Sequence, residues 1–278
     1  MEHDIHFPKY SVLMSVYYKE NPKYLDISID SMLKQTVKAN EFIIIEDGEL
    51  TKELTEVINK YVTQYPKLFK IIKNKKNIGL GPSLNKGVIA STNELIARMD
   101  SDDYSSPNRC EEELKVFMND PELAMVGTFE AEFINDINNV VSIHKVPETN
   151  DQIEKFMRRR CALLHPTVMY KKSAVLKSGN YHSVPLYEDY DLFLRMVLEC
   201  KVKLYNIQKN LYFIRTSADF YKRRGGLKYA KTVLKFKWNM HSKGYMSMND
   251  FFISGIGQAV VCVLPNFVRK FIYLKLLR

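Results

Sequence analysis

The stretch from Glu94 to Asp103, ELIARMDSDD, sets the pattern of the first half of the chain. A run of strand length, 94–99, stops at three carboxylates within four residues, Asp100, Asp102 and Asp103. Carboxylates this close repel one another, and a hard divalent cation such as Mg²⁺ or Mn²⁺ would relieve that repulsion because it prefers oxygen ligands. A solvated acidic turn that caps the next helix would give the same pattern. The sequence of this stretch leaves both possibilities open.

The acidic stretch ends the last of four expected strands, which alternate with amphipathic helical patterns. The strands are expected at 11–16, 41–45, 69–72 and 94–99. Strands alternating with helices predict a mostly parallel, doubly wound sheet. Ligands of such sheets bind beyond the carboxyl ends of the strands, where Asp47 also lies. A carboxylate there can accept hydrogen bonds from a base or ribose, but taken alone Asp47 beside Gly48 is more typical of a turn.

The second half is less regular, with strands expected at 125–129 and 140–144 and helices at 151–160 and 189–200. The last helix begins with a third acidic group, Glu188-Asp189-Tyr190-Asp191. Acids at a helix start are favoured by the helix dipole. The functional alternative is a general base, since a carboxylate beside a bound substrate can take a proton from it.

Two further segments have possible ligand contacts. His165-Pro166-Thr167 offers a metal or acceptor contact, although a lone histidine is more often structural. Arg223-Arg224-Gly225-Gly226 suits a phosphate-binding loop, since arginine binds phosphate with two hydrogen bonds. A solvated basic turn is an equally good interpretation of the second segment.

Composition narrows the class of protein. The 278 residues include four scattered cysteines with no Cys-x-x-Cys pair, which argues against a disulfide framework or a zinc site and favours a reducing cytosol. The first residues carry no apolar run of the kind found in secretory signals. From Lys201 onward there are 16 Lys and Arg against two acids, of 41 and 32 in the whole chain. This asymmetry implies an anionic partner for the C-terminal part: a membrane surface, a phosphorylated acceptor or nucleic acid.

The end of the chain combines apolar and basic residues. The apolar run 251–265 is shorter than the roughly 20 residues that a membrane-spanning helix needs. Residues 267–278 mix large apolar side chains with Arg269, Lys270, Lys275 and Arg278. This suits a segment lying in the interface of an anionic cytoplasmic leaflet. A C-terminal helix that packs on the catalytic domain with a basic outer face is the alternative.

Taken in order, these segments resemble an inverting family 2 glycosyltransferase with the A-type, Rossmann-like nucleotide-diphospho-sugar transferase fold. The resemblance covers roughly residues 10–226. It is carried by SVLMSVYY (11–18), SMLKQT (31–36), IEDG (45–48), NIGL (77–80), LNKG (84–87), DSDD (100–103), HPT (165–167) and EDYDLFLR (188–195). The implied layout is a catalytic domain at 1–226, with a nucleotide-binding half (1–105) and an acceptor half (106–226), followed by a helical, membrane-associating extension at 227–278.

The resemblance also implies site residues. Asp47 would hold the base, Asp100 the ribose and Asp102 the Mn²⁺ or Mg²⁺ that bridges the diphosphate, while Asp189, beside Glu188, would be the catalytic base. The implied nucleotide-sugar contacts further include Ser15, Tyr17, Glu20 and Asn85, and the implied acceptor contacts are His165, Arg223 and Arg224. The family often has a second aspartate where this chain has Glu46.

The expected function is transfer of a hexose or N-acetylhexosamine from a nucleoside diphosphate sugar, with UDP the expected nucleotide. Similar enzymes build bacterial O-antigen, capsule or exopolysaccharide on a polyprenyl diphosphate carrier, so a lipid-linked saccharide acceptor and a peripheral position on the inner face of the plasma membrane are expected. A sugar nucleotidyltransferase is one alternative, but 17–21 lacks that class's glycine-rich basic loop. A nucleic-acid-binding module is the other, and none of its usual motifs is present.

Overall fold

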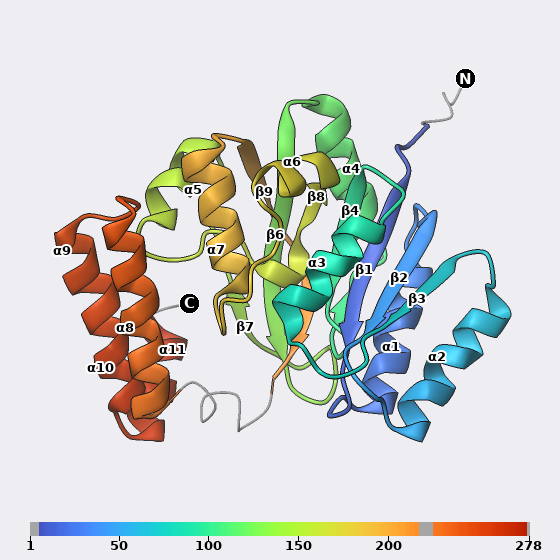
Figure 1. The fold of residues 1–278 in the computed structure, drawn as a ribbon, viewed down its shortest axis with the longest axis horizontal. Coiled ribbons are helices and arrows are strands. Elements are labelled where there is room, and N and C mark those ends of the chain that lie inside the picture. The colour runs from blue at the N-terminus through green and yellow to red at the C-terminus, as the bar shows by residue number, and fades with distance from the viewer. Residues whose placement is uncertain (1–5, 217–224, 277–278) are drawn as a thin grey trace.

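The computed structural model describes residues 6–216 and 225–276. Its first half alternates strands and helices as expected (Figure 1). The elements are β1 (Tyr10–Val16), α1 (Pro22–Leu33), β2 (Glu41–Glu46), α2 (Lys52–Gln64), β3 (Phe69–Lys73), α3 (Leu80–Ala90) and β4 (Leu95–Met99). The predicted start of α1 is confirmed, since the Asn21 side chain accepts a hydrogen bond from the Lys23 amide and Pro22 occupies the first helical position.

The second half adds antiparallel pairings to the sheet. Its elements are β5 (Tyr104–Ser105), α4 (Arg109–Asn119), β6 (Leu123–Phe133), β7 (Val140–His144), α5 (Asn150–Met157), η1 (His165–Thr167), β8 (Met169–Lys171), α6 (Lys172–Lys177), α7 (Glu188–Leu194), η2 (Arg195–Glu199) and β9 (Lys203–Arg215). The nine described strands form one sheet in the order β3-β2-β1-β4-β8-β6-β9-β5, with β7 paired to β6. Strands β1 to β4 pair in parallel, as do β6 and β9, whereas β8 runs antiparallel to both β4 and β6.

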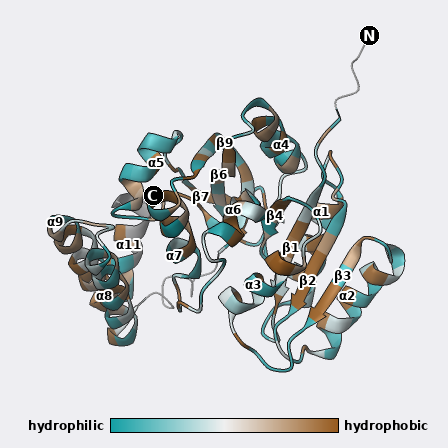
Figure 2. Cartoon of the chain, turned by 45° about the horizontal axis from the view of Figure 1, so that its top comes forward, coloured by the Kyte–Doolittle hydropathy of each residue, from teal (hydrophilic) through white to brown (hydrophobic). Residues whose placement is uncertain are grey.

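Helices cover both faces of this sheet, and β1, β2 and β4 each contribute side chains to both cores. Leu13, Ile43 and Ile96 pack with α3 and α7 on one face. Val12 and Ile44, which are direct sequence neighbours of Leu13 and Ile43, pack with α1, α2 and α4 on the other face. Burial on both faces explains why the sequences of β1, β2 and β4 are mostly apolar. In Figure 2 the first half of the sheet is accordingly coloured largely brown.

The basic C-terminal part counted from Lys201 onward begins inside the sheet. Lys203–Arg215 is the 13-residue strand β9. This strand mixes polar and apolar residues without a regular alternation, and its partners β6 and β5 are far away in the chain. The separate helical region therefore begins only at Leu227.

That region consists of α8 (Leu227–Ser242), α9 (Met248–Asp250), η3 (Phe251–Ile256), α10 (Gly257–Val263) and α11 (Asn266–Leu276), gathered at one end of the molecule (Figure 1). One side of α8 packs on the part of the chain that contains the sheet, residues 10–215, which we call the catalytic half. There Phe236 stacks on Tyr187 with ring centroids 4.1 Å apart. Within the described ranges, no helix is both long and apolar enough to cross a bilayer.

Candidate active site

The acidic groups singled out in the sequence lie at the carboxyl ends of the parallel strands. Asp47 directly follows β2, and Asp100 directly follows β4. Because β2, β1 and β4 are neighbours in that order, these ends form one continuous edge of the sheet. Glu188 and Asp189 reach the same region from the start of α7. The sheet thus brings together residues 47, 100 and 188–189, which are far apart in sequence.

The three carboxylates after β4 have different surroundings. Asp103 is buried, and it accepts hydrogen bonds from the Tyr212 hydroxyl (3.0 Å) and the Arg215 amide (2.7 Å) of β9. Asp100 and Asp102 remain partly exposed. Burial, together with the charge of Asp100, raises the pKa of Asp102 to about 6. Asp103 therefore fastens the acidic turn to β9, while Asp100 and Asp102 keep part of their surface exposed.

This pair fits a divalent cation. Burial and the charge of Asp100 raise the pKa of Asp102 more than the nearby charges of Arg98 and Arg215 lower it, and a bound cation would stabilise the ionised form. Within residues 6–216 and 225–276 no three metal-ligating side chains cluster together. The remaining ligands would then come from substrate phosphates and water, the usual arrangement for Mg²⁺.

Asp47 is buried and already holds the loop before α3. Its Oδ1 accepts hydrogen bonds from the Ile78 amide (2.8 Å) and the Asn74 side chain (3.1 Å), and its Oδ2 accepts one from the Gly79 amide (3.0 Å). A carboxylate accepts about four hydrogen bonds, so one position stays open for a ligand. Asp47 therefore orders the start of α3 whether or not it also contacts a base.

The start of α3 in turn meets the start of α7. A Cβ atom added to Gly81 would lie 3.1 Å from the Glu188 Cβ and 2.5 Å from the His182 carbonyl oxygen, so only glycine allows this approach. Burial raises the pKa of Glu188 to about 7, and the charge of Asp189 adds to this rise. Burial also raises the pKa of Asp189, which hydrogen bonds from backbone amides partly oppose. Two acids with raised pKa values at one helix start suit proton transfer.

Arg98 is a site residue that the sequence analysis missed. It lies on β4 on the same face as Ile96, is 2% exposed, and forms an ion pair with Asp100. Its buried Nε has no hydrogen-bond partner among the described residues. Burial raises the pKa values of Glu188 and Asp189, and the positive charge of Arg98 lowers both of them. A charged residue inside the apolar run LIARM was the signal that could have pointed to it.

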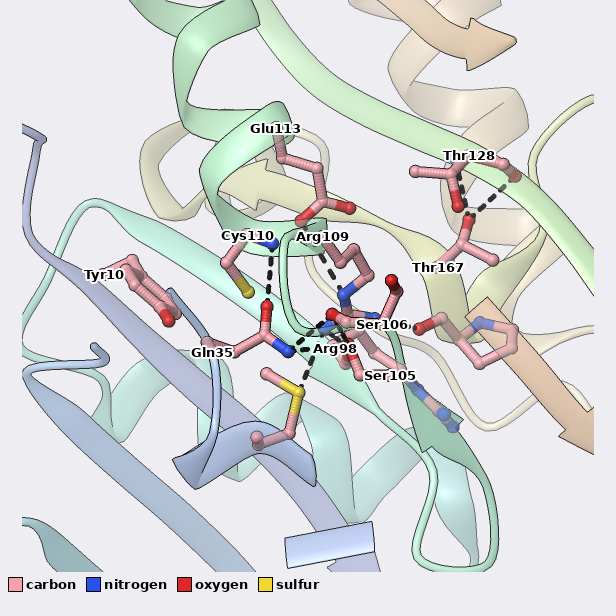
Figure 3. Close-up of polar contacts among 12 residues, drawn as sticks. Tyr10, Gln35, Arg98, Ser105, Ser106, Arg109, Cys110, Glu113, Thr128 and Thr167 are labelled. Atoms are coloured by element: carbon pink, nitrogen blue, oxygen red, sulfur yellow. Dashed lines mark hydrogen bonds and ion pairs between the residues drawn. The ribbon is translucent and has the colours of Figure 1, made fainter. Parts of the chain in front are cut away.

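A second buried arginine, Arg109, contacts the backbone of the strand that carries Arg98 (Figure 3). Arg109 donates hydrogen bonds to the carbonyl oxygens of Arg98 (3.1 Å) and Pro166 (3.0 Å), and so joins the end of β4 to the His165–Thr167 turn. Gln35, at the end of α1, donates to the Ser106 carbonyl (2.8 Å) and accepts from the Cys110 amide (3.0 Å). These contacts hold both ends of the segment that contains the acidic cluster.

The other predicted residues differ in what they contact. Ser15 lies near the end of β1, and Tyr17 and Glu20 follow in the next turn, all three partly exposed. Asn85 of α3 donates a hydrogen bond to the Tyr181 carbonyl (3.0 Å), which ties α3 to the loop before α7. His165 is buried behind the same loop, with its Nε2 3.0 Å from the Tyr181 hydroxyl. Burial lowers the pKa of His165 well below its ordinary value, so it is neutral and suits a supporting role. Arg223 and Arg224 lie outside the described residues.

Comparison with known proteins identifies the family. The model for glycosyl transferase family 2 matches residues 11–179, more than half of the chain. The chain belongs to glycosyl transferase family 2. This membership decides for a glycosyltransferase over the nucleotidyltransferase and the nucleic-acid-binding module. The match includes Asp47, Asp100 and Asp102 but ends before Glu188, so the assignment of the base depends on the geometry.

Relatives of this family 2 glycosyltransferase act in bacterial polysaccharide synthesis. It is 36% identical to the UDP-Gal:alpha-D-GlcNAc-diphosphoundecaprenol beta-1,3-galactosyltransferase of Escherichia coli, over 98% of this chain and 97% of that one. It is 29% identical to the amylovoran biosynthesis glycosyltransferase AmsE of Erwinia amylovora, over 96% and 98%.

Solved structures share the fold of this glycosyltransferase. A mannosyltransferase of Pyrobaculum calidifontis, in complex with GDP-Man and Mn²⁺, superposes with a TM-score of 0.63 at 11% identity, over 95% of this chain and 78% of that one. S. aureus TarS (residues 1–349), in complex with UDP-GlcNAc, gives 0.59 at 18% identity, over 81% and 66%. The predicted A-type transferase fold is confirmed.

Proposed function

We propose that this glycosyltransferase moves a hexose or N-acetylhexosamine from a UDP-linked donor to a sugar hydroxyl of a lipid-linked acceptor, with inversion at the anomeric carbon. The observation that carries this proposal is the meeting of two pairs of acids at one sheet edge. Asp100 and Asp102 follow β4, and Glu188 and Asp189 begin α7, with Arg98 buried nearby.

The first pair is suited to the donor. Asp102 would hold a divalent cation against the diphosphate, and Asp100 would accept hydrogen bonds from the ribose. When bound, the cation offsets the charge that develops on the leaving diphosphate. Asp47 would use its remaining acceptor position for the base, beside Ser15 and Tyr17 at the end of β1. The turn at 100–103 keeps its shape because Asp103 is fastened to β9.

The second pair is suited to the acceptor. Asp189 would take the proton of the acceptor hydroxyl as the oxygen attacks the anomeric carbon from the face opposite the leaving group. One displacement of this kind inverts the configuration and needs no covalent intermediate. A base must be ionised to act, and the charge of Arg98 favours the ionised form of Asp189 against burial.

The lipid-linked acceptor is supported by a relative and by charge. The Escherichia coli relative, which matches nearly the full chain, is named for a diphosphoundecaprenol-linked acceptor. The region from Leu227 onward is rich in lysine and arginine, as binding to an anionic membrane requires. We therefore place the enzyme peripherally on the inner face of the cytoplasmic membrane, with Arg223 and Arg224 as candidates for the acceptor diphosphate.

Calorimetric titration with UDP and Mn²⁺ tests the donor site. Wild type should bind UDP at micromolar concentration only with the metal, and Asp102→Ala should lose this binding. Asp151→Ala, which removes an exposed acid at the start of α5, is the matched control and should bind like wild type. If metal-dependent binding is seen, UDP-galactose is the first donor to screen with a lipid-linked N-acetylglucosamine acceptor. Equal UDP binding by Asp102→Ala and wild type would refute the metal assignment.

A further inference from the structure

The helical region carries an open apolar groove of about 750 Å³ between α8 and the η3–α10 helix. Its lining is almost entirely apolar and includes Leu227, Leu234, Trp238, Phe251, Val260 and Val263. Several of these side chains are unusually exposed for their type, with Leu227 at 73% and Trp238 at 52%. A contiguous exposed apolar surface of this kind marks a binding surface.

The groove does not lie on the side of α8 that packs on the catalytic half. Val233, Phe236 and Met240 turn inward and join the main core, whereas Leu227 and Trp238 stay outside it. Ala259 and Cys262 of α10 belong to the same core. The groove is thus a rigidly held surface, and the apolar face continues beyond it through Phe252 (56% exposed) and Ile253 (62%) of η3.

Basic residues accompany this apolar surface. Lys231 and Lys235, one helical turn apart on α8, line the groove and are exposed. The acid of this region, Asp250, forms an ion pair with Arg159 of the catalytic half. From Leu227 to the end of the chain the sequence holds no other acid. The groove is therefore apolar, is bordered by lysines, and has no acid nearby that lacks a basic partner among the described residues. These properties complement a lipid bilayer, which has anionic headgroups above a hydrocarbon layer.

We infer that the α8–α10 groove docks the protein on an anionic phospholipid bilayer, with apolar side chains entering the acyl boundary while Lys231 and Lys235 meet headgroup phosphates. The inference deepens the proposed function, because it supplies the surface that would bring the site to a lipid-linked acceptor. It places the membrane contact within the extension predicted at 227–278, on α8 and α10. Interfacial helices bind in this way through buried apolar area combined with electrostatic attraction.

The protein offers an internal probe for this contact. Trp238 is its sole tryptophan and lines the groove. On mixing with vesicles of phosphatidylglycerol and phosphatidylcholine, the tryptophan emission should shift to shorter wavelength. Vesicles with brominated acyl chains should quench it. The apparent affinity should fall as salt is raised, since the lysine contribution is screened.

Paired substitutions separate docking from folding. Removing a lysine near an anionic surface weakens binding about fivefold, so Lys231→Gln with Lys235→Gln should weaken vesicle binding about 30-fold. Lys52→Gln with Lys67→Gln, two exposed lysines on and just after α2, should bind vesicles like wild type. Truncation before residue 251 is unsuitable as a test, because it would remove Ala259 and Cys262 from the core.

The inference would be overturned if the protein bound purely neutral vesicles with equal affinity, or if the control pair weakened vesicle binding as much as the Lys231 and Lys235 substitutions. It would also be overturned if tryptophan emission did not change on mixing with vesicles. A tryptophan that is already blue-shifted and shielded from acrylamide without vesicles would also overturn it, because a second copy or the chain itself would then fill the groove. The fluorescence test uses neither donor nor acceptor. Failure of docking with intact metal-dependent UDP binding would therefore refute the groove and leave the proposed transferase site standing.

Discussion

Replacing Asp189 by asparagine tests the assignment of the catalytic base most directly. The substitution keeps the size of the side chain and its place at the start of α7 but removes the proton acceptor. A general base contributes about 10²–10⁴ in rate, or roughly 3–5.5 kcal/mol of barrier. We expect a fall of this size in the rate of sugar transfer at saturating donor, with UDP binding largely unchanged.

The structure also predicts how stability responds. Burial raises the pKa of Asp189 above its ordinary value, so folding disfavours its ionised form. Wild-type stability therefore falls as pH rises from the ordinary pKa of 3.8 to the raised value, and the asparagine variant lacks this fall. Near neutral pH, Asp189→Asn should unfold at the same temperature as wild type or higher.

Asp191, two residues on, gives a contrasting control. Its Oδ2 accepts hydrogen bonds from Arg195 Nε (3.0 Å) and Nη2 (2.9 Å), and both side chains are buried. Breaking a buried pair by removing one partner destabilises a protein by about 3–5 kcal/mol. Asp191→Asn should therefore lower the unfolding temperature, whereas Asp189→Asn should not.

The assay is single-turnover transfer from a radiolabelled UDP-sugar, followed across pH, with calorimetry and thermal unfolding on the same samples. Wild-type transfer should fall as pH drops through the raised pKa of Asp189, and the residual rate of Asp189→Asn should lack that dependence. Near-native turnover in Asp189→Asn, or a loss matched by loss of UDP binding, would refute the assignment of the base.

Three further predictions concern the residues around the site. Asp47→Ala leaves two backbone amides and the Asn74 side chain without their acceptor, and should cost about 2–4 kcal/mol in urea unfolding; unchanged stability would contradict the bonding seen. Arg98→Met removes the positive charge that favours ionised Asp189, so the acid limb of the pH–rate profile should move to higher pH, and a profile that stays in place would count against this role. Glu113 of α4 is buried beside Arg109, and burial raises its pKa to about 8, so wild-type stability should fall as pH rises from about 4.5 to 8, and Glu113→Gln should lack this fall when urea unfolding is compared at pH 5.5 and 8.

The sequence predicted best the strands that are buried on both faces of the sheet. Strands β1, β2 and β4 are covered on both faces, so their sequences are mostly apolar and have recognisable ends. Strand β9 mixes polar and apolar residues irregularly, and β8 has three residues, so neither shows a distinct local pattern. Their places in the sheet depend on pairing with strands distant in the chain.

The sequence by itself determined the family, the parallel first half of the sheet, and the position of the acidic groups at strand and helix ends. These features follow from local periodicity and from motifs of a few consecutive residues. The tertiary structure decided what each acid can do. Asp103 is fastened by Tyr212 and Arg215, which come more than 100 residues later, while Asp100 and Asp102 stay available.

The same holds for the charge that balances the site and for the apolar groove. Arg98 looked like an isolated charge in a strand until folding placed it near acids from α7. Trp238 and Val260 belong to different helices, and only their packing makes one surface of them. Hydrogen bonds, ion pairs and hydrophobic surfaces depend on distance in space, and residues far apart in sequence acquire that proximity only in the folded chain.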